Sequence, residues 1–412
     1  MKTVITVFKV LRWTVAIFLL LFAFSAMMGG RYGQTLCMVF IATFLVFWPA
    51  GIENRLNRKG SLALRILIIV LLIAGMKTVF KSDPKSSIYR SEDSKSELMA
   101  IYQELLEDWP TETARQHIST QYGKVHCLEC GNPENPPLVM FHAASMGAFS
   151  WAENLEPLLD NYHIYSFDNI GEGNRSYLND ALVFPSTPEE IAAFYRDLLN
   201  QLSIDSAVVF GASNGGFIAQ VLAYYYPEKV SRMVLFGPMG LTTLTKGSIA
   251  MMGISTMYPF QFLRDAVAKW ALGTAPECHD KYGKWFDQIM KGTIPSIAHP
   301  LPMTEVQKET MDIPILLFLG TEDRIVGDAN EAKEMGEMYP DIQIEVLESG
   351  HLIAVEHANQ GPHTLSAFLN PCLGTSLRGP LDARMWGLRR GGIATDHDSV
   401  SFPIPPPINN GE

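Results

Sequence analysis

A serine framed by glycines has the clearest chemical potential in this chain. The segment Gly211-Ala-Ser213-Asn-Gly215 follows directly on the apolar run 206–210. In a nucleophile elbow, a serine occupies a strained turn between a strand and a helix, so that its hydroxyl projects from the top of a sheet. The residues from 216 to 224 are typical of a helix, which gives Ser213 that context. We therefore predict that Ser213 is a nucleophile.

A serine hydroxyl needs a base to accept its proton and a carboxylate to orient that base. His351 follows a glycine just past the strand-like run 342–347, and Asp323 lies just past the run 314–319. Both are expected at the carboxyl ends of strands, where chemistry gathers in parallel sheets. Glu322 is an alternative acid in the same turn. The predicted order along the chain, Ser–Asp–His, is specific to one scaffold.

Acyl transfer also requires backbone N–H groups that stabilise an oxyanion. The residue after the nucleophile, Asn214, is expected to supply one donor. The loop after the strand-like run 137–141, which reads His-Ala-Ala-Ser-Met-Gly, is expected to supply the other. Its small residues let the backbone approach a substrate, and we assign the donor to Ala144, with Ala143 as the alternative.

Short apolar runs that alternate with helical patterns must position these residues. This rhythm predicts an α/β protein with a mostly parallel sheet flanked by helices on both faces. A hairpin at 115–131 and a helix at 97–107 are expected before it, and a helix at 188–202 within it. The predicted strands are 137–141, 162–167, 206–210, 232–236, 314–319 and 342–347.

The stretch from 239 to about 305 interrupts this rhythm. It lacks strand patterning and is rich in methionine and large aromatic residues, so we expect a helical cap inserted after the sixth strand. Methionine gives an adaptable apolar wall, which favours a hydrophobic acyl substrate. The alternative is an ordinary connection with a small core of its own. The predicted substrate contacts are Met257 and Phe260 in the cap, with Ser145 and Met146 in the oxyanion loop.

Together these motifs resemble the α/β-hydrolase fold superfamily, in its capped serine hydrolase or esterase type. The resemblance covers about residues 110–370 and rests on the motifs 142–147, 168–176, 211–215 and 320–323, and on Gly350-His351 with Glu356 after it. It implies a triad of Ser213, Asp323 and His351, with Asp323 rather than Glu322 as the acid. Ala143 departs from the family's usual glycine, and a positive φ at that position would strain an alanine.

Composition excludes several other classes. The net charge is −11 without a basic block in the C-terminal part, which argues against nucleic acid as a partner. Cys127 and Cys130 form a single Cys-x-x-Cys within a strand-like run. A zinc site would need a second pair, so we predict no metal and no cofactor, and whether the two cysteines form a disulfide stays open.

The first 80 residues contain uncharged apolar stretches at 13–30 and 32–52 and a third stretch at 62–80. Each is close to the roughly 20 residues that span a bilayer, so two or three transmembrane helices are predicted, with a signal peptide as the alternative for the first. Basic residues in the short loops place the N-terminus in the cytoplasm. Three spans would then place the remaining chain outside the cytoplasm, which we favour, and two would keep it inside.

The expected organisation is therefore a membrane segment (1–80), a polar linker (81–96), a hydrolase domain (97–372) and a disordered tail (373–412). The expected function is a membrane-anchored serine hydrolase that cleaves a small, hydrophobic carboxylic ester. Thioester, lactone, amide and C–C bonds run on the same machinery, so they stay open. Further alternatives are a non-catalytic module that binds a small molecule, and a transporter or partner-binding unit formed by the spans.

Overall fold

The computed structural model describes residues 87–243, 247–248, 261–271, 276–357, 365 and 368–369. The predicted membrane segment, residues 81–86 of the predicted linker and the predicted tail lie outside these described residues. Within them, no helix combines the length and the apolar character needed to cross a membrane. The chain divides into two compact units, 1–366 and 367–412, and the first contains the sheet and its helices.

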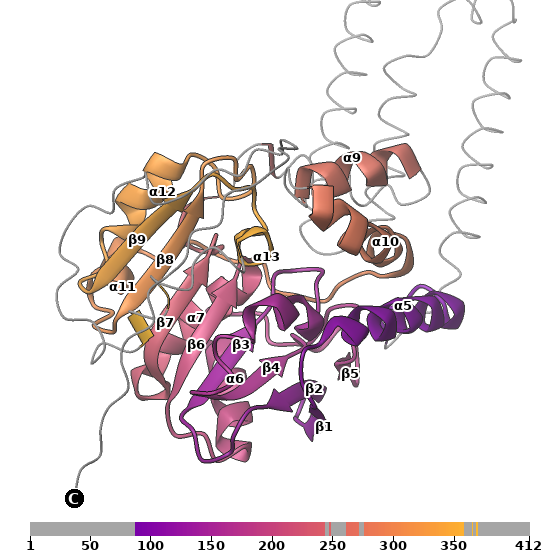
Figure 1. The fold of residues 1–412 in the computed structure, drawn as a ribbon, viewed down its shortest axis with the longest axis horizontal. Coiled ribbons are helices and arrows are strands. Elements are labelled where there is room, and N and C mark those ends of the chain that lie inside the picture. Colours follow the sequence, from indigo (N-terminus) through magenta and orange to yellow (C-terminus); the bar gives the residue numbers. More distant parts are fainter. Residues whose placement is uncertain are drawn as a thin grey trace, which may run out of the picture. The chain divides into compact units, whose positions relative to one another are not determined.

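Unit one is built around a nine-stranded sheet with the order β1-β2-β4-β3-β6-β7-β8-β9, and β5 pairs with β2 (Figure 1). All neighbours from β4 to β9 are parallel, whereas β1, β2 and β5 are joined by antiparallel pairing. The sheet is therefore mostly parallel, as expected. The strands are β1 (Ala114–Ser119), β2 (Gly123–Cys130), β3 (Pro137–Phe141), β4 (His163–Phe167), β5 (Tyr177–Leu178), β6 (Ala207–Ala212), β7 (Val230–Phe236), β8 (Ile315–Gly320) and β9 (Ile342–Leu347).

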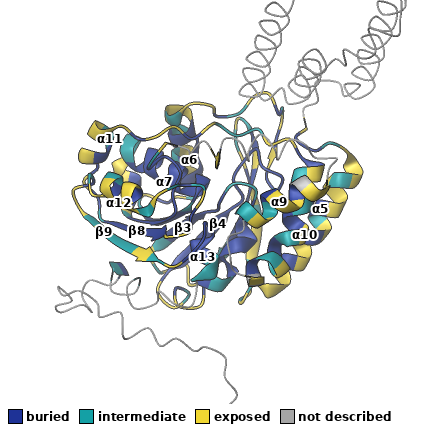
Figure 2. Cartoon of the chain, turned by 90° about the horizontal axis from the view of Figure 1, so that it is seen from above, coloured by how far each residue is buried: buried dark blue, intermediate teal, exposed yellow. Residues whose placement is uncertain are grey.

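The central strands are buried along nearly their whole length because helices cover both faces of the sheet. Figure 2 shows β3 and β4 buried between helices whose outer faces are exposed. The two-residue β5 was not predicted from the sequence, and with it counted the cap follows β7, the seventh strand. The helices and 3₁₀ turns are α5 (Glu92–Leu105), η1 (Leu106–Asp108), η2 (Ala148–Asn154), α6 (Pro188–Gln201), α7 (Asn214–Tyr225), η3 (Pro227–Lys229), α9 (Gln261–Ala271), α10 (Pro276–Gly292), α11 (Glu305–Glu309), α12 (Ala329–Gly336) and α13 (Ile353–Glu356).

Helix α5 begins five residues before the expected start at 97, inside the segment assigned to a polar linker. Ser91 is its N-cap, and its hydroxyl accepts a hydrogen bond from the backbone N–H of Ser94 at 3.0 Å. The acidic residues Glu92 and Asp93 occupy the first turn, where negative charge interacts favourably with the helix dipole. Capping thus extended the helix beyond the apolar spacing on which the prediction rested.

Two helices, α9 and α10, lie in the region predicted as a cap, and α10 packs along α5 (Figure 1). Ion pairs join the two helices on the outside, including Lys284 with Glu104 at 2.7 Å. The end of α10 is also joined to the chain just before α5, because the backbone N–H of Arg90 donates a hydrogen bond to the carbonyl oxygen of Gly292 at 2.9 Å. The residues preceding the sheet therefore hold the cap helix at its C-terminal end.

Both cysteines of the Cys-x-x-Cys pair lie on β2 as free thiols. Both are buried, and burial raises the pKa of Cys130 to about 11. Thiols with raised pKa values are poor nucleophiles and poor metal ligands at neutral pH. In this structure they are strand residues and do not form a disulfide.

Candidate active site

Ser213 occupies the turn between β6 and α7, with φ 49° and ψ −113°. This conformation is strained for a residue with a side chain, and the glycines around it allow the tight turn. A Cβ on Gly215 would lie 2.0 Å from the carbonyl oxygen of Phe141, and one on Gly211 would lie 2.6 Å from that of Gly215. Small residues are required here because strand and helix backbones approach closely.

Asp323 and His351 meet at the carboxyl ends of β8 and β9. His351 Nδ1 lies 2.8 Å from Asp323 Oδ2, and both side chains are buried. Asp323 Oδ1 accepts from the backbone N–H groups of Ile325 and Val326 at 2.8 and 3.0 Å. Burial by itself would raise the pKa of Asp323, but His351 and these hydrogen bonds outweigh it and hold the pKa below its usual value. A carboxylate held this way fixes the orientation of the imidazole.

The end of β7 brings Ser213 next to this pair. The backbone N–H of Ser213 donates to Phe236 O at 3.0 Å, and a Cβ on the next residue, Gly237, would lie 2.9 Å from Asp323 Oδ2. His351 Nε2 is buried and has no hydrogen-bond partner in the described part of the chain. A hydrogen bond from Ser213 Oγ to His351 is also absent from the described contacts. Catalytic contacts of this kind often tighten only when substrate binds.

Glu356 shapes the turn that carries His351. Its Oε2 accepts from Ser349 Oγ at 2.6 Å and from the backbone N–H of Gly350 at 2.9 Å. The neighbouring Glu322 is exposed, so it does not replace Asp323 as the partner of His351.

The loop after β3 carries one of the two predicted oxyanion donors, Ala144. Its positive φ is at Ser145, with φ 64°, and neither Ala143 nor Ala144 has a positive φ, so Ala143 is not strained. Both backbone polar groups of Ser145 are held: its N–H donates to Glu172 Oε2 at 2.5 Å, and its carbonyl accepts from Trp285 Nε1 at 2.8 Å.

The second predicted donor, Asn214, is the first residue of α7. The first N–H groups of a helix have no partner within it, and they form the positive end of the helix dipole. The assignment of Asn214 and Ala144 as oxyanion donors stays a prediction.

A small cavity of about 20 Å³ lies beside His351. Met146 and Ala212, the residue before the nucleophile, line this cavity. Met146, a predicted substrate contact, therefore lies near the candidate site. The lining is otherwise mostly apolar and includes Trp151 and Leu352. Of the other predicted substrate contacts, Ser145 is engaged through its backbone as above, and Met257 and Phe260 lie outside the described residues.

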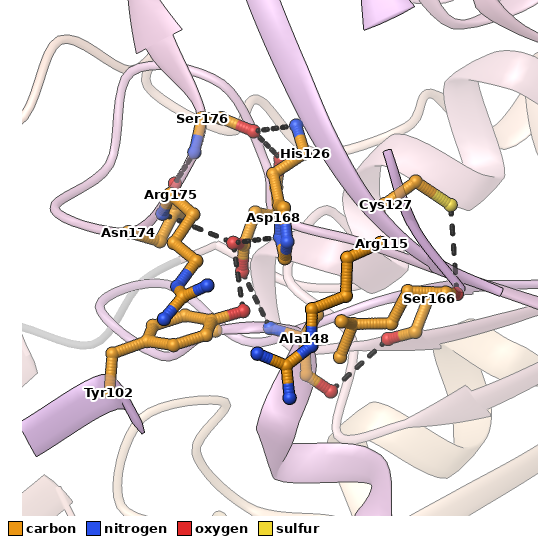
Figure 3. Close-up of polar contacts among 12 residues, drawn as sticks. Tyr102, Arg115, His126, Cys127, Ala148, Ser166, Asp168, Asn174, Arg175 and Ser176 are labelled. Carbon is orange, nitrogen blue, oxygen red and sulfur yellow. Dashed lines mark hydrogen bonds and ion pairs between the residues drawn. The ribbon is translucent and has the colours of Figure 1, made fainter. Parts of the chain in front are cut away.

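Asp168, which follows β4, connects the elements beneath the oxyanion loop (Figure 3). Its carboxylate accepts from Tyr102 Oη in α5 at 2.9 Å, from Ala148 N at 2.7 Å and from Arg175 N at 3.1 Å, and it contacts His126 Nδ1 in β2 at 2.9 Å. Burial opposes ionisation of Asp168, yet these partners hold its pKa below the usual value. One carboxylate thus joins α5, β2 and η2.

Two residues at the site were not predicted from the sequence. Glu172 lies within the 168–176 motif but was assigned no role, although a carboxylate in a motif otherwise rich in glycine and asparagine was a usable signal. Trp285 was counted only as part of an apolar cap, and nothing in the sequence indicates that it reaches Ser145.

Comparison with known proteins supports the architecture described above. A sequence profile of the α/β hydrolase fold matches residues 136–273. The structure aligns with naproxen esterase (carboxylesterase NP) from Bacillus subtilis with a TM-score of 0.62 at 23% identity, covering 68% of this chain and 99% of that one. The chain has the α/β-hydrolase fold.

Two further comparisons cover a similar share of this chain. Carboxylesterase CesB (YbfK) from Bacillus subtilis aligns with a TM-score of 0.61 at 22% identity, over 69% of this chain and all of that one. In sequence, the uncharacterized carboxylesterase nap of Bacillus subtilis (strain 168) is 24% identical over 311 residues, which are 72% of this chain and 99% of the relative.

Proposed function

We propose that this protein is a carboxylic ester hydrolase. The observation that carries the proposal is the buried 2.8 Å contact between His351 Nδ1 and Asp323 Oδ2 beside a serine in a strained strand-to-helix turn. The carboxylesterase names of similar proteins from Bacillus subtilis point to the same bond type.

In the proposed mechanism, Ser213 Oγ attacks the ester carbonyl while His351 Nε2 accepts its proton. Asp323 holds the proton of His351 on Nδ1 and stabilises the imidazolium that forms. The N–H groups of Asn214 and Ala144 stabilise the oxyanion. His351 then protonates the leaving alcohol, and water releases the acid from the acyl-enzyme in a second round with the same roles.

The site is also proposed to act at a membrane. The apolar stretches within residues 1–80 are each long enough to cross a bilayer, and the hydrolase unit begins only a few residues after them. We propose a multi-pass anchor, with the hydrolase unit outside the cytoplasm, and a hydrophobic ester as substrate.

A fluorophosphonate probe tests the nucleophile directly. The full-length protein should be labelled covalently, and Ser213→Ala should not be. Ser203→Ala is a matched control because Ser203 also has a positive φ, of 59°, but follows the C-cap of helix α6, before β6 begins. Unlabelled wild-type protein would refute the enzyme proposal, and labelling that survives Ser213→Ala would refute Ser213 as the nucleophile.

Esters of increasing acyl length test the substrate class. A hydrophobic site should raise kcat/KM from acetate to octanoate, because each buried methylene contributes about 0.8 kcal/mol. A preference for acetate would contradict a long-chain substrate while leaving the ester hydrolase proposal intact.

A further inference from the structure

Glu172 is a buried carboxyl group at the oxyanion loop with one oxygen used and one unused. The residue is 1% exposed. Its Oε2 accepts the backbone N–H of Ser145, the residue of the loop with positive φ. Its Oε1 is buried and receives no hydrogen bond in the described part of the structure. A buried carboxylate with an unused oxygen is costly, so the state of this group needs an explanation.

A second buried acceptor without a donor lies nearby. Asn169 Nδ2 donates to His142 O at 2.9 Å, which fixes the orientation of the amide. Its Oδ1 is buried and receives no hydrogen bond from the described residues. The side chains of Asn169 and Asn214 lie within hydrogen-bonding reach of the Glu172 carboxyl, and all three residues line one cavity of about 30 Å³. Two buried oxygens of this cluster, Glu172 Oε1 and Asn169 Oδ1, receive no hydrogen bond in the described structure, and a proton on Glu172 would supply a donor.

The electrostatic surroundings favour that proton. Burial raises the pKa of Glu172 to about 8, against the opposing effects of Ser145, Asn169 and Asn214, and the nearby Asp168 raises it further. Tyr195 from α6 also faces Glu172, and burial lowers the pKa of His142, at the end of β3, so it is neutral. The side chains that α5 and α10 place against the adjacent Gly173 are not titratable: Leu98, Ile289 and Thr293.

We propose that Glu172 is a neutral carboxylic acid at neutral pH and acts as a positioning residue for the oxyanion loop. One oxygen accepts the Ser145 N–H, and the other donates its proton within the Asn169–Asn214 cluster. With Trp285 Nε1 on the Ser145 carbonyl, the proton-bearing Glu172 fixes the two peptide groups that flank Ser145 and thereby restrains the neighbouring peptide, which carries the Ala144 N–H. Ionisation would place a negative charge beside the site where an oxyanion forms and would weaken catalysis. This inference rests on the proposed ester hydrolase function.

The test compares Glu172→Gln with Glu172→Ala in the full-length protein. Glutamine reproduces the proposed pattern at every pH, because its carbonyl accepts from Ser145 and its amide donates. We expect wild-type kcat to fall above pH 8 and Glu172→Gln to lack this alkaline loss while keeping most of the kcat at pH 7. Glu172→Ala should lose about tenfold or more in kcat with little change in KM, because a misplaced donor affects the transition state.

Glu228→Gln, on the exposed turn η3, is the control and should keep the wild-type pH profile. An alkaline loss in Glu172→Gln equal to that of the wild type would overturn the proposal, as would a kcat in Glu172→Gln as low as in Glu172→Ala.

A spectroscopic measurement separates failure of this inference from failure of the proposed function. In an infrared difference spectrum of wild type minus Glu172→Gln at pH 6.5, a protonated carboxyl band should appear and should vanish as the pH rises through about 8. A carboxylate band at pH 6.5 would refute the neutral state. If the acid band appears but no ester is hydrolysed, the protonation is retained and the hydrolase function fails.

Discussion

At the scale of single residues, Asp323 is the buried acid that pairs with His351. Its carboxylate is buried, yet it keeps a pKa below the usual value because His351 and two backbone N–H groups stabilise the ionised form. Asparagine has nearly the same shape as aspartate but no charge. Replacing Asp323 by asparagine therefore removes the interaction that orients His351 while the packing is kept.

Asp323→Asn should lower kcat by about 10³–10⁴-fold while the protein stays folded, because the asparagine amide stabilises the wrong tautomer of His351. Glu322→Gln, on the exposed neighbour, should change kcat by less than about twofold. The measurement is steady-state ester hydrolysis with circular dichroism on each variant. Equal losses in the two variants would remove Asp323 from its proposed role.

The Asp323 carboxylate also makes the free energy of unfolding depend on pH. Its folded pKa lies below the ordinary value of 3.8, so the ionised form stabilises the native state above that pH. The contribution is lost as the pH falls through the lower folded pKa. Glu172 has the opposite sign: its proton is favoured in the native state, and its contribution to stability diminishes from pH 4.5 to about 8.

At the scale of elements, the strand-to-helix junction at Ser213 has no room for added atoms. Gly215→Ala would drive a methyl group into the backbone of β3, 2.0 Å from Phe141 O, and backbone cannot move aside cheaply. We expect the free energy of unfolding to fall by about 3–5 kcal/mol, at the upper end of single-residue effects.

Gly283→Ala is the matched control inside α10, because no atom lies within 4 Å of its added Cβ. It should stabilise the protein by about 0.5–1 kcal/mol through helix propensity. Urea unfolding of the two variants measures both changes, and a destabilised Gly283→Ala or an unaffected Gly215→Ala would contradict the packing described here.

The alternation of elements was predictable because apolar runs and turn residues report burial locally. The elbow at Ser213 and the strand-end positions of Asp323 and His351 followed from that rhythm. The predicted start of helix α5, residue 97, was wrong because the N-cap at Ser91 begins the helix before its apolar spacing does. Glu172 was missed although its carboxylate stands out in the 168–176 motif. The contact of Trp285 with Ser145 could not be predicted, because it joins residues 140 positions apart that only the fold brings together.

At the scale of the whole molecule, α5 connects the predicted membrane segment to the hydrolase unit. Leu98 and Tyr102 of α5 are fully buried, and Tyr102 also reaches Asp168. The helix is therefore part of the folded unit, although it begins within the segment predicted to link that unit to the membrane.

Two truncations separate anchoring from folding. A chain of residues 87–412 should leave the membrane fraction yet retain esterase activity, because it keeps α5. A chain of residues 109–412 should lose both activity and cooperative unfolding, because it exposes the buried faces of α10 and β2. Cell fractionation and thermal unfolding measure the two outcomes, and an 87–412 chain that still pelleted with membranes would contradict the predicted anchor.

Helix α10 is held by α5 along its length, by Arg90 at its C-terminal end and by Ser145 through Trp285. A segment that closes over a site must be able to move relative to the rest of the fold. The contacts described restrain α10 both at its C-terminal end and along the side that packs on α5. We therefore expect α10 to behave as a fixed wall during turnover, so that it selects among substrates by their size before binding and not by closing around them afterwards.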